Sequence, residues 1–327
     1  MPTTDAPTVA MLWESVDPHT ALTSRFGFTD AAAATRWLAD TLAAQWEIAL
    51  HSCERIVISA GNALAWLDTS AGSLLAKWSV RAEYFPRLAE LARLTAWLDG
   101  RGLPVSALMP ARDGRLQLEL DGVSLGLQSV IAGALMDADD QAQVYATGAV
   151  LARLHHALAD YPHTDRIAVL PGDRPSAPLA DQIRHWLEST DPTPGAETLR
   201  DWVAALPAID GMSTQLIHSD IRSANVFCDG PRVVALLDFD DAYVDYPVHD
   251  LAHAAVLLGT RFRNWGPVPV SSHRTLVAGY ESVRPLSSVE RAWLDVLVLW
   301  RTLGVVRGAG DDPTGWGQSV RELIADR

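Results

Sequence analysis

The sequence predicts an α+β fold of two lobes: a small N-terminal lobe with an antiparallel sheet and one helix, and a larger, mainly helical C-terminal lobe. The chain has 327 residues, more than one hydrophobic core usually organises. Short β-like runs fill residues 51–132, whereas helical spacing of apolar residues dominates residues 133–327. Hydrophobic residues make up 48% of the chain and charged residues 20%, as in folded globular proteins.

Residues 1–50 are expected to form a helical extension before the first lobe. Apolar residues recur at helical spacing over 30–47, and Thr29 or Asp30 can cap the start of this helix.

The N-terminal lobe begins with three β-like runs separated by two turn signals, which predicts two consecutive hairpins. The runs are 55–59, 63–68 and 73–80, and the turn signals are Gly61-Asn62 and Ser70-Ala71-Gly72. A helix over 83–99 follows, and further strands are expected at 105–109, 116–120 and 125–131.

The C-terminal lobe is predicted from long stretches of helical periodicity around one short β-rich passage. Helices are expected at 138–160, 248–259, 271–283, 288–305 and 317–325, and strands at 215–217 and 233–237.

Charge and cysteine content exclude several classes of partner. A net charge of −14 argues against binding nucleic acid or an anionic membrane, because both require clustered Lys and Arg. Cys53 and Cys228 have no CxxC spacing, so neither a disulfide framework nor a zinc site is indicated. No signal peptide and no apolar stretch of about 18 residues is evident. We expect a cytoplasmic protein without a nucleic-acid or membrane partner; its oligomeric state is not encoded in any readable pattern.

The basic residues are unusually uneven. Of 26, Lys77 is the single lysine, and the rest are arginines. Because a lysine ammonium is compact and flexible where a guanidinium is planar, a lone retained lysine suggests a role that arginine cannot fill. Biased codon usage explains the count equally well.

The segment 216–250 contains the densest polar pattern. His218, Asp220 and Asn225 give H-x-D-x-x-x-x-N after one β-like run, and Asp238 follows a second run. Phosphoryl transfer needs a carboxylate to orient the acceptor hydroxyl and take its proton, and an amide and a second carboxylate to hold Mg²⁺ on the nucleotide. The pattern therefore predicts a phosphoryl-transfer site.

This segment resembles the catalytic and metal loops of the aminoglycoside phosphotransferase family, small-molecule relatives of the protein kinases. The resemblance implies a protein-kinase-like fold and a kinase that uses Mg²⁺ and ATP or GTP. It implies Asp220 as catalytic base, Arg222 as a γ-phosphate contact, and Asn225 and Asp238 as Mg²⁺ ligands. Ser219 stands where the family usually has Gly, a replacement that suits a loop if φ is negative there.

Two further residues match the family pattern. Asp250 resembles the aspartate that braces the catalytic loop, although a carboxylate in the first turn of a helix is favoured in any protein. His155 matches a histidine at the end of a long helix, and we expect it to pack in the core.

The resemblance extends into the N-terminal lobe. Such a lobe carries a lysine on its third strand, paired with a helix glutamate, to hold the α- and β-phosphates. Lys77 falls on the third predicted strand, which favours the functional interpretation. Glu90 is the expected partner, with Glu83 as the alternative because the helix start is uncertain.

Other nucleotide contacts are expected by the same resemblance. The turn containing Ser59, Gly61 and Asn62 would cover the phosphates, although a plain hairpin explains it nearly as well. Gln128 and Val130 lie where the two lobes join and would present backbone groups to the adenine.

Other functions stay open. His249 and His253 flank an acid as in a zinc helix, but Asp is shorter than Glu and no third ligand is evident. A catalytically inactive, kinase-like regulator is a second alternative. A protein kinase is disfavoured because Asp238 and Asp250 are too close for an activation segment.

The resemblance implies a small-molecule acceptor with a hydroxyl group. Asp240, Asp241 and Asp245 could attract a cationic acceptor such as an aminoglycoside or another amine-bearing antibiotic, which would imply antibiotic resistance, or they could be solvated loop residues. A metabolite acceptor, such as a sugar, a homoserine-like amino alcohol or a choline-like amine, is the alternative.

Overall fold

The computed structural model describes residues 6–167, 178–191, 193–209, 211–306 and 314–327. It divides into two compact units, Met1–Ala132 and Gly133–Arg327. Each is described by itself.

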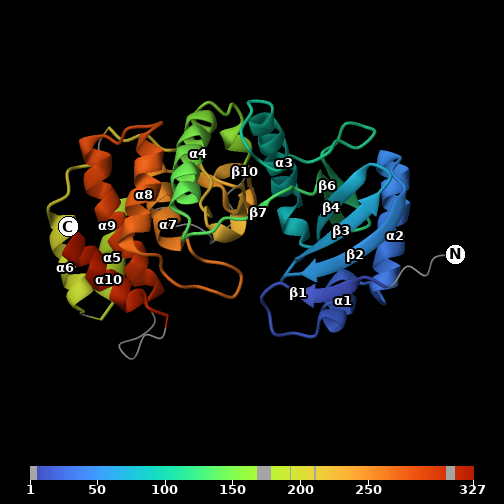
Figure 1. Cartoon of the computed structure of the whole chain (residues 1–327), viewed down its shortest axis with the longest axis horizontal. Coiled ribbons are helices and arrows are strands. Elements are labelled where there is room, and N and C mark those ends of the chain that lie inside the picture. The colour runs from blue at the N-terminus through green and yellow to red at the C-terminus, as the bar shows by residue number, and fades with distance from the viewer. Residues whose placement is uncertain (1–5, 168–177, 192, 210, 307–313) are drawn as a thin grey trace. The chain divides into compact units, whose positions relative to one another are not determined.

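A six-stranded sheet with three helices forms the first unit (Figure 1). Its strand order is β1-β2-β3-β4-β6-β5; β1 runs parallel to β2 and the other neighbours are antiparallel. The elements are β1 (Thr8–Met11), α1 (Pro18–Phe26), α2 (Ala31–Trp46), β2 (Leu50–Ile58), β3 (Asn62–Thr69), β4 (Gly72–Ser79), α3 (Phe85–Asp99), β5 (Gln117–Leu120) and β6 (Val123–Ser129).

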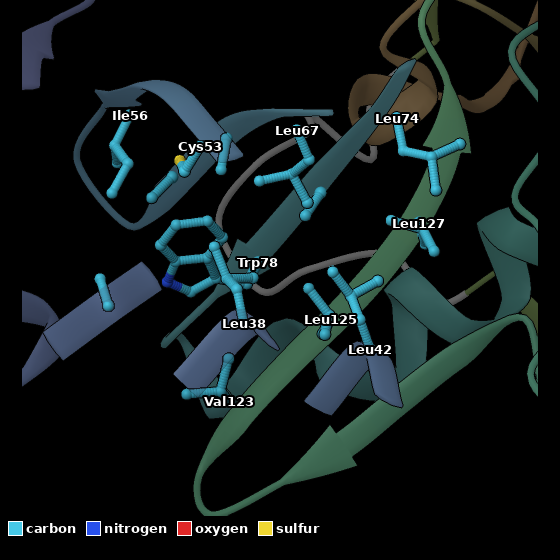
Figure 2. Packing of buried hydrophobic residues seen from close by; sticks show 14 of the residues in the cluster. Leu38, Leu42, Cys53, Ile56, Leu67, Leu74, Trp78, Val123, Leu125 and Leu127 are labelled. Carbon is cyan, nitrogen blue, oxygen red and sulfur yellow. The ribbon is translucent and has the colours of Figure 1, made fainter. Parts of the chain in front are cut away.

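The core of this unit lies between α2 and the sheet. Figure 2 shows Leu38 and Leu42 of α2 close to Trp78 of β4 and Leu125 of β6. Trp78 is fully buried and contacts Trp37 and two phenylalanine rings edge-on or tilted. Asp30 accepts a hydrogen bond from the Ala33 amide and caps α2. Helix α2 therefore covers one face of the sheet.

Two sequence predictions for this unit need correction. The expected strand over 105–109 is not a strand: proline precedes and follows it, and only Met109 donates its amide to the neighbouring Leu127 carbonyl. In addition, β1 lies within the segment expected to be a helical extension, and it lengthens the sheet at the β2 edge. The strand that carries Lys77 is consequently β4, the third strand of the antiparallel part.

The second unit is mainly helical, with two small sheets ordered β10-β9-β7 and β11-β8. Its elements are β7 (Ala134–Leu135), α4 (Gln141–Ala159), α5 (Leu179–Ser189), α6 (Pro194–Ala204), β8 (Gln215–Ile217), β9 (Val226–Asp229), β10 (Arg232–Leu236), β11 (Tyr243–Asp245), α7 (Pro247–Leu257), α8 (Val270–Glu281), α9 (Ser288–Val305) and α10 (Trp316–Asp326).

Helices α4 and α8 pack against each other over much of their lengths (Figure 1). Two glycines allow this approach. A Cβ on Gly148 would overlap the Leu276 carbonyl oxygen, and one on Gly279 would overlap the Tyr145 carbonyl oxygen. The predicted helices of this unit are confirmed, whereas α5 and α6 had no expected counterpart.

Both cysteines, Cys53 and Cys228, are buried as free thiols, and burial raises the pKa of each to about 11. Among the described residues, no helix combines the length and the apolar composition needed to cross a membrane.

Candidate active site

The catalytic loop joins β8 to β9, and its polar side chains converge on Asp220. Arg222 Nε donates to both carboxylate oxygens, at 2.9 and 3.1 Å. Asn225 Nδ2 donates to the Asp220 carbonyl at 2.9 Å and to Oδ2 at 2.6 Å. Asp220 and Arg222 keep only 14% of their side-chain surface exposed. The loop therefore presents one well-oriented, mostly buried carboxylate.

The environment of Asp220 favours its protonated form. Burial raises the pKa of Asp220 above its ordinary value; the Arg222 charge and hydrogen bond and His218 lower it, and the nearby Asp238 charge raises it again. A carboxyl group whose pKa is raised is a better proton acceptor than an ordinary aspartate.

His218 holds the two loops of the site together. Its ring Nε2–H donates to the Leu237 carbonyl at 3.0 Å, and Nδ1 accepts the Asp220 amide at 3.2 Å. The Leu237 amide also donates to the Asn225 carbonyl at 2.9 Å. Residue 237 directly precedes Asp238, so these bonds tie the loop that carries Asp220 to the loop that carries Asp238.

Asp250 braces the same loop from α7. Its carboxylate accepts the amides of His218 and Ser219, at 3.0 and 2.9 Å, and His155 Nε2 at 2.9 Å. Burial alone would raise the pKa of Asp250, but its interactions with His155 and with the backbone amide of His218 hold it at about 2.

The histidine in that brace is itself fixed. Tyr280 of α8 lies 2.7 Å from His155 Nδ1, so its hydroxyl donates there while Nε2–H donates to Asp250. His155 is thus more than core packing: it carries a hydrogen-bonded chain from α8 to the catalytic loop.

The expected negative φ at Ser219 is not what the structure has. This residue has φ 70°, in the left-handed region that glycine prefers. The Asp250 carboxylate accepts its amide. The left-handed turn is therefore kept without glycine while α7 supplies a hydrogen-bond acceptor to the Ser219 amide.

Asn225 and Asp238 fit a magnesium ion by their chemistry. Both offer oxygen donors, and because the Asn225 nitrogen donates to Asp220, its amide oxygen is the atom suited to a cation. Mg²⁺ typically takes one or two protein oxygens and completes its shell with phosphate and water. Asp238 also has φ 61°, a strained conformation typical of functional loops.

The contacts of His249 and His253 argue against the alternative of a zinc site. His249 Nδ1 donates to Asp245 at 2.8 Å, and its Nε2 accepts Arg301 at 2.9 Å, while His253 contacts Ser219. In the described part of the chain, no group of three or more His, Cys, Asp or Glu is placed to hold a metal ion.

The Asp245 carboxylate also accepts hydrogen bonds from residues of the same chain. Besides His249 it accepts the Tyr243 hydroxyl and the Tyr246 amide, each at 2.7 Å. These bonds outweigh burial, which would raise the pKa of Asp245, and hold that pKa below its ordinary value. Asp245 thus serves the loop rather than an acceptor amine.

In the first unit, the candidate nucleotide residues lie on β4, β6, α3 and the β2–β3 turn. Lys77 is half-buried and pairs in register with Leu64 and Gly126. Glu90 is 17% exposed and accepts Arg93, whereas Glu83 is 60% exposed and binds Arg81. The pairing of Lys77 with Glu90 stays a prediction.

The β2–β3 turn is closed by its own hydrogen bonds. The Ser59 amide and hydroxyl both donate to the Asn62 carbonyl, and the Gly61 carbonyl accepts the Ser79 hydroxyl and the Val80 amide. A Cβ on Gly61 would overlap the Arg81 side chain. These hydrogen bonds close the turn, and its contact with phosphates stays a prediction.

The β6 end provides the other expected contacts. Gln128 pairs with Leu75, and the Val130 amide donates to the Ser73 carbonyl at 3.0 Å. A nucleotide base would consequently have to use the carbonyl of Val130 and not its amide.

The sequence comparison decides the family. A model described as the phosphotransferase enzyme family matches residues 52–286, which include both sets of candidate residues. The chain belongs to this family. The predicted membership in the aminoglycoside phosphotransferase family is confirmed.

Curated relatives in this family include homoserine kinases. That of Phenylobacterium zucineum is 31% identical over 220 residues, covering 67% of this chain and 66% of the relative. That of Mesorhizobium japonicum is 29% identical over 254 residues, covering 76% and 77%. The chain thus matches just under two thirds of the length of the first relative.

Solved structures confirm the fold. A microcompartment-associated aminopropanol kinase superposes with a TM-score of 0.60 at 16% identity, covering 88% of this chain and 94% of the other. The predicted α+β, protein-kinase-like architecture is therefore correct.

Three supporting residues had no assigned role in the sequence analysis: His218, His253 and Tyr280. His218 was visible as the first residue of the motif, but its bond to Leu237 depends on how two loops fold together. His253 was noted only as part of a zinc-like pattern, and nothing in the local pattern marks Tyr280.

Proposed function

We propose that this protein is a kinase that transfers the terminal phosphate of ATP, or GTP, to the hydroxyl group of a small amino alcohol. Homoserine-like amino alcohols are the acceptors that we propose first. The observation that carries the proposal is the Asp220 carboxylate, mostly buried and oriented by Arg222 and Asn225 beside Asp238.

The reaction follows from this geometry. The acceptor oxygen attacks the γ-phosphorus and forms a new P–O bond while the bond to the β–γ bridging oxygen breaks, releasing the nucleoside diphosphate. Asp220 orients the hydroxyl and accepts its proton. Arg222, a cation adjacent to that carboxylate, balances negative charge that develops on the transferring group.

The remaining candidate residues are proposed to bind nucleotide and metal. Asn225 and Asp238 would hold Mg²⁺, which when bound neutralises phosphate charge. Lys77 would contact phosphate oxygens, with Glu90 positioning it; the low exposure of Glu90 relative to Glu83 supports that choice. Ser59, Gly61, Asn62, Gln128 and Val130 are proposed as backbone contacts to the nucleotide.

Two observations favour an amino alcohol over an amine-bearing antibiotic. The curated relatives described above are homoserine kinases. In addition, Asp245, one of the carboxylates considered for attracting a polycationic drug, is satisfied by Tyr243, Tyr246 and His249.

The test is an acceptor screen with release of ADP or GDP as the readout. Purified protein with Mg²⁺ and nucleotide is offered homoserine, other short amino alcohols, choline-like amines, sugars, aminoglycosides and macrolides. Turnover with an amino alcohol supports the proposal, and preferred turnover of an antibiotic overturns its substrate assignment. Nucleotide binding without turnover of any acceptor would favour the regulator.

Asp220→Asn provides the mechanistic control. The amide keeps the shape of the side chain but cannot accept the proton, so turnover should fall by a factor on the order of 10²–10⁴ while nucleotide binding is kept. Steady-state kinetics and nucleotide titration measure the two effects. Near-normal turnover by this variant would rule out Asp220 as the base.

A further inference from the structure

One large aromatic side chain lies exposed beside the catalytic loop. Trp265 is 49% exposed, and its ring centroid lies 5.8 Å from Cζ of Arg222. Arg222 in turn donates to both oxygens of Asp220. The indole and the base therefore contact the same guanidinium group.

The backbone around this indole is held in place. The Trp265 carbonyl accepts the Nε1–H of Trp316 at 2.8 Å, and Trp316 is buried. On the other side, the Arg261 amide donates to the Asn264 carbonyl, and its guanidinium donates to the Met136 carbonyl, each at 2.7 Å. A fixed backbone with an exposed indole leaves apolar surface in water, which a ligand that covers it would relieve.

The position of Trp265 near Asp220 and Arg222 indicates that this ligand is the acceptor. A reacting hydroxyl must come within hydrogen-bond distance of Asp220, which keeps only a small exposed fraction. The rest of the acceptor then extends over adjoining surface. Among the described residues, Trp265 is the large exposed apolar side chain seen in contact with the Asp220–Arg222 pair.

Charge decides which part of the acceptor meets the indole. An indole face attracts cations, but the Arg222 charge beside it disfavours an ammonium group at the same place. Nucleotide phosphates prefer the cation to the ring. The aliphatic carbons of the acceptor are the group that fits both neighbours.

We propose that Trp265 forms a wall of the acceptor site and packs against the CH₂ groups next to the reacting hydroxyl of a short amino alcohol. This assignment rests on the proposed function, because it takes Asp220 as the base. It makes Trp265 a specificity-determining residue.

The kinetic experiment compares Trp265→Ala and Trp265→Phe with Trp13→Ala. Trp13 is a matched control, 47% exposed and located in the first unit. With the best acceptor, Trp265→Ala should raise the KM for the acceptor at least about tenfold and leave the KM for the nucleotide within about twofold. Trp265→Phe should retain most of the affinity, and Trp13→Ala should behave as wild type.

A binding experiment gives a readout independent of turnover. Protein labelled with fluorotryptophan is titrated with homoserine and the other acceptors, and the Trp265 resonance is identified by its absence in Trp265→Phe. The acceptor should shift this resonance and leave that of Trp13 unchanged. Thermal unfolding of each variant checks that the fold is kept.

The outcomes separate the two proposals. A resonance shift without turnover of any acceptor means that the proposed function fails while the acceptor wall stands. Turnover with an unchanged resonance and an unchanged KM in Trp265→Ala overturns the wall alone. If no acceptor is phosphorylated and none shifts the resonance, both proposals are wrong.

Discussion

Ser219 shows how individual residues maintain the catalytic loop. Its left-handed φ of 70° costs an ordinary residue on the order of 1 kcal/mol relative to the right-handed regions. The Asp250 carboxylate accepts a hydrogen bond from the amide of this residue. This bond holds the backbone directly before Asp220, so the orientation of Asp220 depends on α7.

We expect the loop to tolerate glycine at position 219 but not a branched side chain. Ser219→Gly should not lower the free energy of unfolding, because glycine adopts this φ freely. Ser219→Val should lower it by about 1–3 kcal/mol and reduce turnover, because a β-branched side chain is strained there. Urea unfolding measures both variants. Equal stability of the two would contradict the account.

The pH dependence of turnover should report the environment of Asp220. Because burial raises the pKa of this carboxyl group, the acid limb of kcat/KM should lie above the ordinary aspartate value of 3.8, with activity falling as pH falls through it. Arg222 lowers that pKa, so Arg222→Gln should move the limb to still higher pH.

Arg232→Gln is the control for this pH experiment, since Arg232 is exposed and pairs with Asp229. It should leave the pH profile unchanged. A limb that stays in place in Arg222→Gln would mean that Asp220 is not the titrating group.

Sequence reasoning predicted the candidate site residues because their spacing is local. Asp220 and Asn225 lie five apart on one loop, and Asp238 directly follows a predicted strand. It could not find the φ of Ser219 or the bond from His218 to Leu237, since both depend on groups brought together by folding. The motif residues could be predicted from the sequence, whereas the backbone conformation and hydrogen bonds that hold them could not.

At the scale of secondary structure, α4 and α8 pack with their backbones close together at Gly148 and Gly279. This contact matters to the site because α4 carries His155 and α8 carries Tyr280, the two members of the chain that ends at Asp250. The glycines in the contact allow these helices to approach closely enough for that chain to form.

Substituting one of these glycines should loosen the contact. Gly148→Ala or Gly279→Ala should lower the free energy of unfolding by about 1–3 kcal/mol, because the added methyl group meets a backbone carbonyl. Gly304→Ala in α9 is the control: no atom lies within 4 Å of its added Cβ, so helix propensity should make it neutral or stabilising. Denaturant unfolding compares the three, and equal effects would refute the packing argument.

Element prediction succeeded where periodicity was long and failed where prolines or pairing decided the outcome. Helix 288–305 was predicted with the bounds that α9 has. Residues 105–109 looked β-like, yet Pro104 and Pro110 limit them to isolated bonds. Strand β1 was missed because its four residues gain stability only by pairing with β2.

At the scale of the whole molecule, the two units carry different candidate residues. Lys77 and Glu90 belong to Met1–Ala132, and Asp220, Asn225 and Asp238 to Gly133–Arg327. Nucleotide binding is therefore tested on the complete chain.

Magnesium and nucleotide should raise the thermal unfolding temperature of the wild-type protein. At 100 times the dissociation constant, the stabilisation is about 2.7 kcal/mol. Asp220→Asn should keep this shift, whereas Lys77→Met should lose most of it because the phosphate contact is removed. Thermal scans with and without nucleotide test this, and an undiminished shift in Lys77→Met would exclude Lys77 from nucleotide binding.

Lys77 has one more consequence, which concerns proteolysis. It is the sole lysine of the chain and lies within β4, between β3 and β6. A lysine-specific endoprotease therefore has one peptide bond to cut, and it can bind that bond only when β4 leaves both neighbours. The rate of this single cleavage therefore reports how readily the six-stranded sheet of the first unit opens at β4.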